Sequence, residues 1–104
     1  MADCLDPSVR FRGLVTRGPI DGVGRDAVMP WLRKWFDGPD ALEIVDATVG
    51  EVGPKLYLRW RVTMSPGTPG AAVRLVEQHV FATIDGSIVS FDLLCSGFSE
   101  LPHP

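Results

Sequence analysis

Residues 77–95 of this chain read Glu-Gln-His-Val-Phe-Ala-Thr-Ile-Asp-Gly-Ser-Ile-Val-Ser-Phe-Asp-Leu-Leu-Cys. Two runs rich in β-branched and aromatic residues flank the dipeptide Asp85-Gly86, which is typical of a two-residue type I′ turn. If the loop holds only these two residues, Ile84 faces Ser87, and every pair farther from the turn follows by counting. The segment therefore predicts an antiparallel β-hairpin with a defined register.

This register places His79 opposite Asp92 and Gln78 opposite Leu93. Because side chains alternate across a strand, one face of the hairpin is mostly apolar and the other carries the Asp–His pair. A carboxylate beside an imidazole fixes its tautomer and makes it a usable general base. His79 and Asp92 are therefore the candidate catalytic residues. The alternative is a polar cross-strand pair on a dimer surface.

The composition is that of one ordinary globular domain, spanning residues 1–104. Hydrophobic residues make up 45% of the 104 positions and charged residues 22%, which supports a single core. A net charge of −3 argues against a nucleic-acid surface, because such a surface needs a basic stripe. No apolar run approaches the ~20 residues that span a bilayer, and residues 1–7 lack the features of a secretory signal. We expect a cytoplasmic protein with no nucleic-acid or membrane partner.

Metal and disulfide chemistry have little support in the sequence. Cys4 and Cys95 are expected to be free thiols in a reducing cytosol. Only two histidines are present, and His103 lies between prolines near the C-terminus, so no zinc or iron site is recognisable. We expect neither a metal nor a cofactor.

Hydrophobic periodicity predicts one main helix and several strands. Residues 25–37 form an amphipathic helix that ends at Gly38-Pro39, with Pro30 near its start, where a missing backbone N–H does least harm. Period-two or β-branched runs predict strands over residues 9–15, 41–49, 56–64, 73–84 and 87–96. The first is expected to be a short edge strand, and the strands that follow the helix form an antiparallel meander. The class is α+β, with a core over residues 9–98 and a flexible Pro-rich tail over residues 99–104.

The strand over residues 56–64 divides cleanly into two faces. Its even positions are apolar, while its odd positions include Tyr57, Arg59 and Arg61. The even set must be buried, and the odd set must meet water, a partner or opposite charges. If odd positions pair with odd positions in the next strand, one of the arginines lies opposite Glu77. We expect the face bearing Arg59, Arg61 and Glu77 to support a homodimer.

The order of these elements resembles the nuclear-transport-factor-2-like superfamily, and most of all its SnoaL-like polyketide cyclase type. The resemblance rests on Gly-Arg-Asp-Ala at the helix start, Glu-Gln-His in a strand, the Asp-Gly-Ser-Ile turn and a final long strand, and it covers roughly residues 9–98. It implies a curved antiparallel sheet that forms an α+β cone around a small-molecule pocket. The N-terminal helices usual in that family are expected to be shortened or missing.

The resemblance also implies where a ligand would bind and what the protein would do. Gln78 lies near the position at which ketosteroid isomerases hold an oxyanion donor, and the alternative is a buried amide satisfied by its neighbours. The leading expectation is binding of an apolar, ring-containing small molecule. The alternatives are a cofactor-independent cyclase, isomerase or dehydratase, and a homodimerisation module without catalysis. The expected ligand-contacting residues are Trp31, Leu58, Trp60, Gln78, Val80, Phe91 and Leu93.

Overall fold

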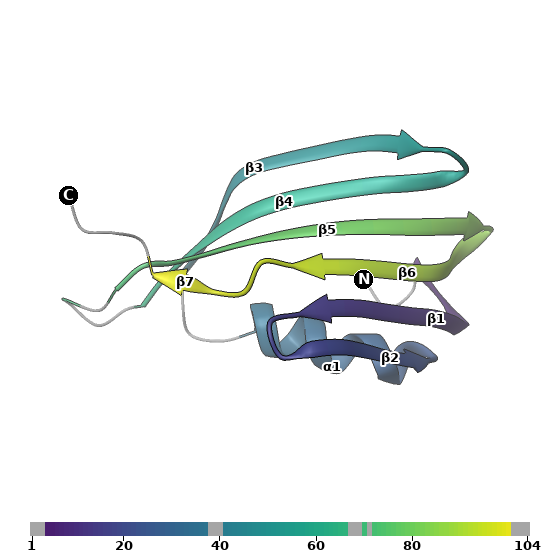
Figure 1. The fold of residues 1–104 in the computed structure, drawn as a ribbon, viewed down its shortest axis with the longest axis horizontal. Helices are drawn as coiled ribbons and strands as arrows, with labels where there is room; N and C mark the ends of the chain where they lie inside the picture. The colour runs from purple at the N-terminus through teal and green to yellow at the C-terminus, as the bar shows by residue number, and fades with distance from the viewer. Residues whose placement is uncertain (1–3, 38–40, 67–69, 71, 101–104) are drawn as a thin grey trace.

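A curved sheet with one helix on its inner side makes up the described chain (Figure 1). The computed structural model describes residues 4–37, 41–66, 70 and 72–100. The elements in chain order are β1 (Leu5–Val15), β2 (Gly18–Val23), α1 (Arg25–Phe36), β3 (Ala41–Val52), β4 (Lys55–Ser65), β5 (Arg74–Asp85), β6 (Ser87–Cys95) and β7 (Ser99–Glu100).

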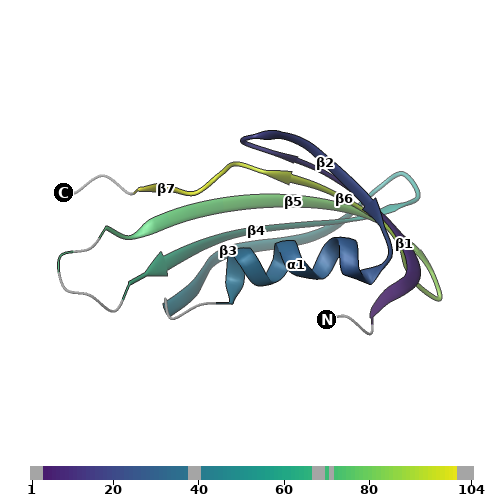
Figure 2. The ribbon, with the colours of Figure 1, turned by 90° about the horizontal axis from the view of Figure 1, so that it is seen from below.

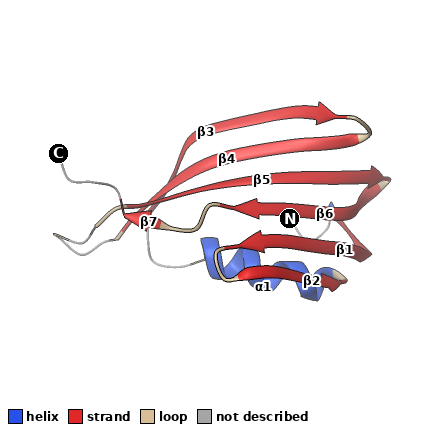
Figure 3. Cartoon of the chain, in the orientation of Figure 1, coloured by secondary structure: helices blue, strands red, loops and turns tan. Residues whose placement is uncertain are grey.

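The strands lie in the order β2-β1-β6-β5-β4-β3, and the short β7 pairs with the start of β5. All neighbours are antiparallel except β1 and β6, which are parallel. The sheet is therefore mixed, and the predicted all-antiparallel sheet is wrong at this one pairing. Its α+β class and its curvature around a single main helix are confirmed (Figures 2 and 3).

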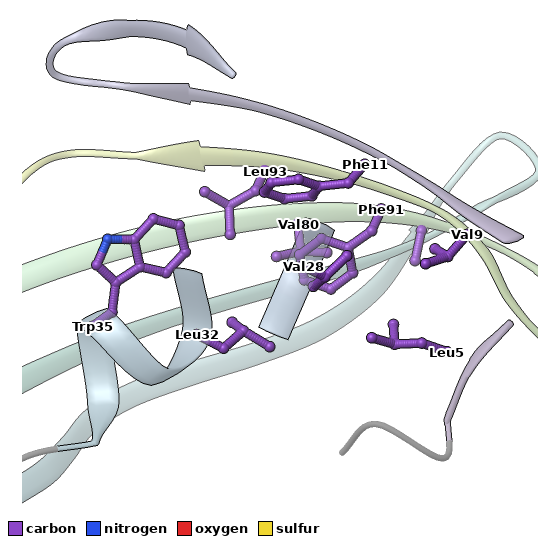
Figure 4. Packing of buried hydrophobic residues seen from close by; sticks show 10 residues of the cluster. Leu5, Val9, Phe11, Val28, Leu32, Trp35, Val80, Phe91 and Leu93 are labelled. Carbon is purple, nitrogen blue, oxygen red and sulfur yellow. The ribbon is translucent and has the colours of Figure 1, made fainter. Parts of the chain in front are cut away.

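Helix α1 runs along β1 and β2 and packs its apolar stripe against the inner side of the sheet (Figure 1). Val28, Leu32 and Trp35 are buried, and they meet side chains of β1, β5 and β6 (Figure 4). The rings of Phe11 and Phe91 lie next to each other in this core, with centroids 6.0 Å apart. The buried cluster consists of Leu5, Val9, Phe11, Val28, Leu32, Trp35, Val80, Ala82, Phe91 and Leu93.

The start of α1 is held to β1 by two hydrogen bonds. The backbone N–H of Gly24 donates to the carbonyl of Val9 at 2.7 Å, and Nε of Arg25 donates to the carbonyl of Leu5 at 2.8 Å. These contacts begin the helix at Arg25, so Pro30 lies inside the helix instead of near its start as predicted. Pro30 is on the exposed side, where its ring faces away from the core.

The segment over residues 18–23 forms a strand that is not among the predicted ones. Gly18, Pro19 and Gly22 are poor strand residues, but β2 is at the edge of the sheet and pairs only with β1. An edge strand tolerates proline because its outward N–H has no partner to lose. Consequently β1, with β2 on one side and β6 on the other, is an interior strand and not the predicted edge.

The β5–β6 hairpin exists, but its register is two residues away from the predicted one. Asp85 pairs with Ser87 across Gly86, and a bulge at Val89 follows. Among the described residues positive φ angles occur only at glycines, so Asp85 does not adopt the first position of a type I′ turn. The turn and the bulge each displace the pairing by one residue. Because the total shift is an even number of residues, side chains that were predicted to share a face of the hairpin still share it.

The chain after β6 turns at Gly97 and returns to β5 as β7. Residues 99 and 100, predicted to be part of a flexible tail, pair with Leu75 and Arg74, whereas residues 101–104 lie outside the described residues. Gly97 has a φ of +82°, and a Cβ atom there would overlap the Cγ2 methyl of Thr16 in the β1–β2 turn. Glycine is required at this position both for its backbone conformation and for the close approach.

We predict that Gly97→Ala destabilises the protein by about 1–3 kcal/mol, the cost of a left-handed residue without glycine's freedom. The overlap with Thr16 adds to this loss. Urea denaturation should show Thr16→Ser, which removes the overlapping methyl, restoring part of the stability in the Gly97→Ala background. Thr16→Val keeps that methyl and serves as the matched control. Equal stability of Gly97→Ala and the wild type would contradict the packing of this turn.

Candidate functional site

The two faces of the sheet have opposite chemistry, as the alternation predicted. The face toward α1, here called the inner face, carries the buried residues Val76, Gln78 and Val80 of β5. On the other, outer face, Arg61 pairs with Glu77 and Arg59 with His79 across β4 and β5. The predicted odd–odd pairing is confirmed. Charged groups therefore collect on the side of the sheet away from the helix.

Glu77 is the centre of the outer face. Its Oε1 atom accepts hydrogen bonds from both arginines, at 3.1 Å from Arg59 and 2.8 Å from Arg61, while Oε2 lies 2.8 Å from Nε2 of His79. These donors stabilise the carboxylate, and they lower the pKa of Glu77 from 4.5 to about 2, with the hydrogen bond of His79 as the largest cause and that of Arg61 next. Arg59 also pairs with Asp46 of β3 and lowers the pKa of that carboxyl. The network thus joins three strands.

His79 connects Glu77 to a phenol. The hydroxyl of Tyr57 is 2.5 Å from Nδ1 of His79, on the side of the ring opposite Glu77. A carboxylate only accepts, so in the neutral imidazole the proton is on Nε2 and Nδ1 accepts from the tyrosine. Tyr57 also packs on Phe81, with ring centroids 5.1 Å apart. The result is a half-buried Tyr–His–Glu chain.

The predicted cross-strand pairing of His79 with Asp92 is wrong. In the observed register His79 lies opposite Leu94, and Asp92 lies opposite Phe81. Asp92 instead accepts hydrogen bonds from Arg12 and Lys55, each at 3.0 Å. Arg12 is the largest cause of the lowered pKa of Asp92. Catalytic roles for the two residues stay predictions, but they cannot be those of a directly bonded dyad.

The predicted ligand-contacting residues separate into three groups. Gln78 and Val80 are fully buried, and Phe91 and Leu93 nearly so. Leu58 and Trp60 are half-buried on the part of the inner face near β3. Trp31 is half-buried on α1 and lines a groove described below. Their role in binding stays a prediction, and only the second and third groups, which are Leu58, Trp60 and Trp31, have partly exposed side chains.

The side-chain amide of Gln78 forms hydrogen bonds within the protein. Its Oε1 accepts from the indole N–H of Trp60 at 2.9 Å, and its Nε2 donates to the sulfur of Cys95 at 3.4 Å. With 0% of its surface exposed, it contacts no space that could hold even a water molecule. This arrangement is that of a satisfied buried amide, the alternative that the sequence left open.

A groove opens on the inner side between α1 and the β1–β2 turn. It encloses about 340 Å³, within the range of about 300–1,000 Å³ usual for small-molecule sites. We call it the tryptophan groove. Its aromatic walls are Trp31, Trp35 and Phe98, and Cys95 and the turn around Thr16 also line it. The rings of Trp31 and Trp35 are tilted by 40°, with centroids 5.5 Å apart.

A second hollow, of about 440 Å³, lies on the outer face. It is lined by Arg12, Asp92, Phe81 and the exposed side chains of Leu14 and Leu94, among others. Its lining includes the Arg12–Asp92 ion pair and Phe81, and the Phe81 ring packs on that of Tyr57. This hollow is larger than the tryptophan groove but more open to solvent.

Part of the inner face near β3 is exposed. Every described residue of β3 except Gly50 is exposed, including Ile44 at 68% and Val49 at 71%. By register, Ile44 faces Val62, and after a bulge Val49 faces Leu58. These apolar side chains thus extend the same face as Trp60. Within the described ranges, no helix covers them.

Several predictions concern partners and location. Across the described residues there is no group of three or more His, Cys, Asp or Glu side chains that could hold a metal ion. None of the described chain forms a helix long and apolar enough to cross a membrane. Both cysteines are free thiols. The cytoplasmic location and the homodimer through Arg59, Arg61 and Glu77 stay predictions.

Sequence reasoning missed Tyr57 and Phe98 as site residues. Tyr57 was placed on the correct face, but its contact with His79 depends on the β4–β5 register, which the loop between those strands leaves open. Phe98 reaches the groove only because Gly97 turns the chain back toward Thr16. Lys34 lies three residues after Trp31 on α1, and helical spacing could have shown that its ammonium lies over that indole.

We predict that Glu77 contributes a pH-dependent stability. Because its pKa in the folded protein, about 2, is below the ordinary value of 4.5, the contribution is complete above pH 4.5 and is lost as the pH falls toward 2. Urea denaturation of the wild type and Glu77→Gln should therefore show a difference at pH 7 that shrinks between pH 4.5 and 2.5. Glu51→Gln, on exposed β3, is the control and should show no such trend. A difference that is constant over this range would contradict the network.

Known proteins resemble this chain in their fold. None of the curated proteins is similar enough to the chain to count as a match. Among solved structures, a candidate polyketide cyclase from Xanthomonas campestris pv. campestris superposes with a TM-score of 0.64 at 19% identity, covering 90% of this chain and 74% of the other. A candidate isomerase from Rhodopseudomonas palustris gives 0.59 at 14% identity, covering 91% and 73%.

A phenazine biosynthesis-related protein from Pseudomonas aeruginosa gives a TM-score of 0.58 at 17% identity, covering 91% of this chain and 66% of the other. At these identities the likeness shows the fold alone. The sequence profile of the SnoaL-like domain matches residues 1–91, most of the chain. With the curved sheet and its helix, this match confirms the resemblance seen in the sequence: the chain belongs to the SnoaL-like domain family, within the nuclear-transport-factor-2-like group.

Proposed function

We propose that this SnoaL-like domain binds a small, ring-containing molecule in the tryptophan groove. The observation that carries the proposal is the set of three aromatic side chains, Trp31, Trp35 and Phe98, around a hollow of about 340 Å³. Aromatic walls favour flat rings, through burial of apolar surface and through offset or edge contacts between rings. The groove also borders the packed core, so its walls are supported from behind.

The tryptophan groove is a better candidate than the interior of the cone. Gln78 and Val80 have no exposed surface, and a ligand among them would have to displace packed side chains. Displacing well-packed core groups costs the contacts that they make with one another. The groove requires no such displacement, since Trp31 and Phe98 are already half-buried walls of an open space.

It is also a better candidate than the outer hollow for an apolar ligand. The outer hollow has the paired charges of Arg12 and Asp92 in its lining, and covering an ion pair with a ring removes solvation from both partners. The tryptophan groove presents no such pair among the described residues that line it. An apolar ring therefore loses less by entering there.

A second candidate function, general acid–base catalysis, is favoured by the Tyr57–His79–Glu77 chain. A base oriented by a carboxylate and bonded to a hydroxyl is the arrangement that moves a proton between a side chain and a substrate. Glu77 takes the orienting role that the sequence assigned to Asp92. Asp92 and Phe81 line the neighbouring outer hollow, where a substrate would lie, and the ring of Tyr57 packs on that of Phe81.

We predict that naphthalene-2-carboxamide, a neutral bicyclic probe, binds in the tryptophan groove. The three indole N–H signals in a ¹H–¹⁵N NMR spectrum can report the site, because Trp31 and Trp35 line the groove while Trp60 is bonded to Gln78. Titration should move the first two signals and leave the third in place. Trp31→Ala should weaken binding about tenfold through loss of ring contacts, whereas Trp60→Phe should not.

Two results of this titration would count against the proposal. If only the Trp60 signal moves, the ligand uses the exposed face of β3 and β4. If no indole signal moves at millimolar probe, the groove does not bind aromatic rings. Assigning the three signals with single Trp→Phe variants makes these results distinguishable.

For the second candidate we predict a loss of turnover in His79→Ala and Tyr57→Phe with a ring ketone that carries an acidic C–H bond. The loss should be about 10²–10⁴-fold if these groups transfer the proton. Glu77→Gln should lower kcat more than Asp92→Asn, because Glu77 holds the imidazole. If the wild type and His79→Ala turn over the ketone at the same rate, the Tyr57–His79–Glu77 hydrogen-bonded chain takes no part in the reaction.

A further inference from the structure

The charge of the tryptophan groove is opposite to that of the whole chain. The protein has a net charge of −3, yet the described residues that line the groove include Arg17, Lys34 and Arg74 and no Asp or Glu. Even with Arg74 set aside, because it has contacts of its own, Arg17 and Lys34 give the hollow a positive potential in an acidic protein. Such a potential attracts anions and discriminates against cations.

Two of these cations are available to a ligand. In the described part of the chain, neither Arg17 nor Lys34 takes part in an ion pair, and both are exposed at the groove. Arg74 has other contacts: its guanidinium lies 5.4 Å from the Phe98 ring, and Glu100 is opposite it between β5 and β7. We therefore assign the ligand charge to Arg17 and Lys34 alone.

The position of Lys34 relates the charge to the aromatic wall. Its Nζ atom lies 5.2 Å from the centre of the Trp31 ring, close enough for a cation–π interaction. This contact places the ammonium at the edge of the aromatic surface. A ring that packs against Trp35 and Phe98 would therefore bring a substituent within reach of the ammonium.

We infer that the ligand of the tryptophan groove is an aromatic anion, a flat ring bearing a carboxylate that Lys34 and Arg17 bind. The inference rests on the proposed function, since it assigns a charge to the ligand of the same groove. The ring supplies apolar contact, and the carboxylate supplies charge-assisted hydrogen bonds from the ammonium and the guanidinium. Neither the SnoaL-like fold nor the shape of the groove alone requires this charge.

A pair of probes of nearly equal shape tests the inference. Naphthalene-2-carboxylate and naphthalene-2-carboxamide share the ring and differ in charge, and calorimetric titration of the full chain gives a Kd for each. The carboxylate should bind about tenfold more tightly, as expected for charge-assisted contacts at a partly exposed site. Lys34→Gln and Arg17→Gln should each remove part of this preference, because each weakens binding of the carboxylate more than binding of the carboxamide.

Arg33→Gln is the matched control, because Arg33 is exposed on the same helix and does not line the groove. It should leave the preference intact. Raising the salt from 50 to 500 mM should reduce the preference and barely alter carboxamide binding. Equal Kd values for the two probes would overturn the inference while the proposed function stands. A preference that survives in the Lys34→Gln/Arg17→Gln double variant would also overturn it, and no binding of either probe would overturn both.

Discussion

The burial of the apolar stripe of α1 against the inner face of the sheet is the contact on which the rest of the structure depends. Val28, Leu32 and Trp35 meet β1, β5 and β6 at once, and burying each such side chain contributes about 1.5–3 kcal/mol. This packing fixes which face of each strand points inward. Because side chains alternate, it also fixes which residues form the outer face, including Glu77 and His79.

The same contact also positions the tryptophan groove. Trp35 is buried at the edge of the core, whereas Trp31, one turn earlier, is half-exposed beside the β1–β2 turn. The turn approaches closely only because Gly97 lacks a side chain against Thr16. A helix, a hairpin turn and a glycine bend, distant in sequence, thus enclose one space. Each is held by the core, so the groove is largely preformed, which limits the entropy lost on binding.

The outer face is organised by hydrogen bonds between charged groups and not by apolar packing. Its ionised groups are half-exposed, and each surface ion pair by itself contributes little to stability. Glu77 differs because both of its oxygens accept hydrogen bonds from charged or polar donors of β4 and β5. Such a shared acceptor holds three side chains in fixed orientations. Orientation, more than stability, is what this network contributes to the protein.

Local alternation and spacing in the sequence determined much of the fold: the strand over residues 56–64, a helix that begins at Arg25 and the two faces of β4, β5 and β6 follow from it. What alternation cannot show is which strands are neighbours. The parallel pairing of β1 with β6, the β2 edge and the bulge at Val89 depend on contacts between distant segments and on small differences in turn geometry. For the same reason, the sequence predicted only some of the residues at each site. Trp31 and His79 could be named from the sequence, whereas their partners Phe98, Tyr57 and Glu77 became partners only when the tertiary structure set the register.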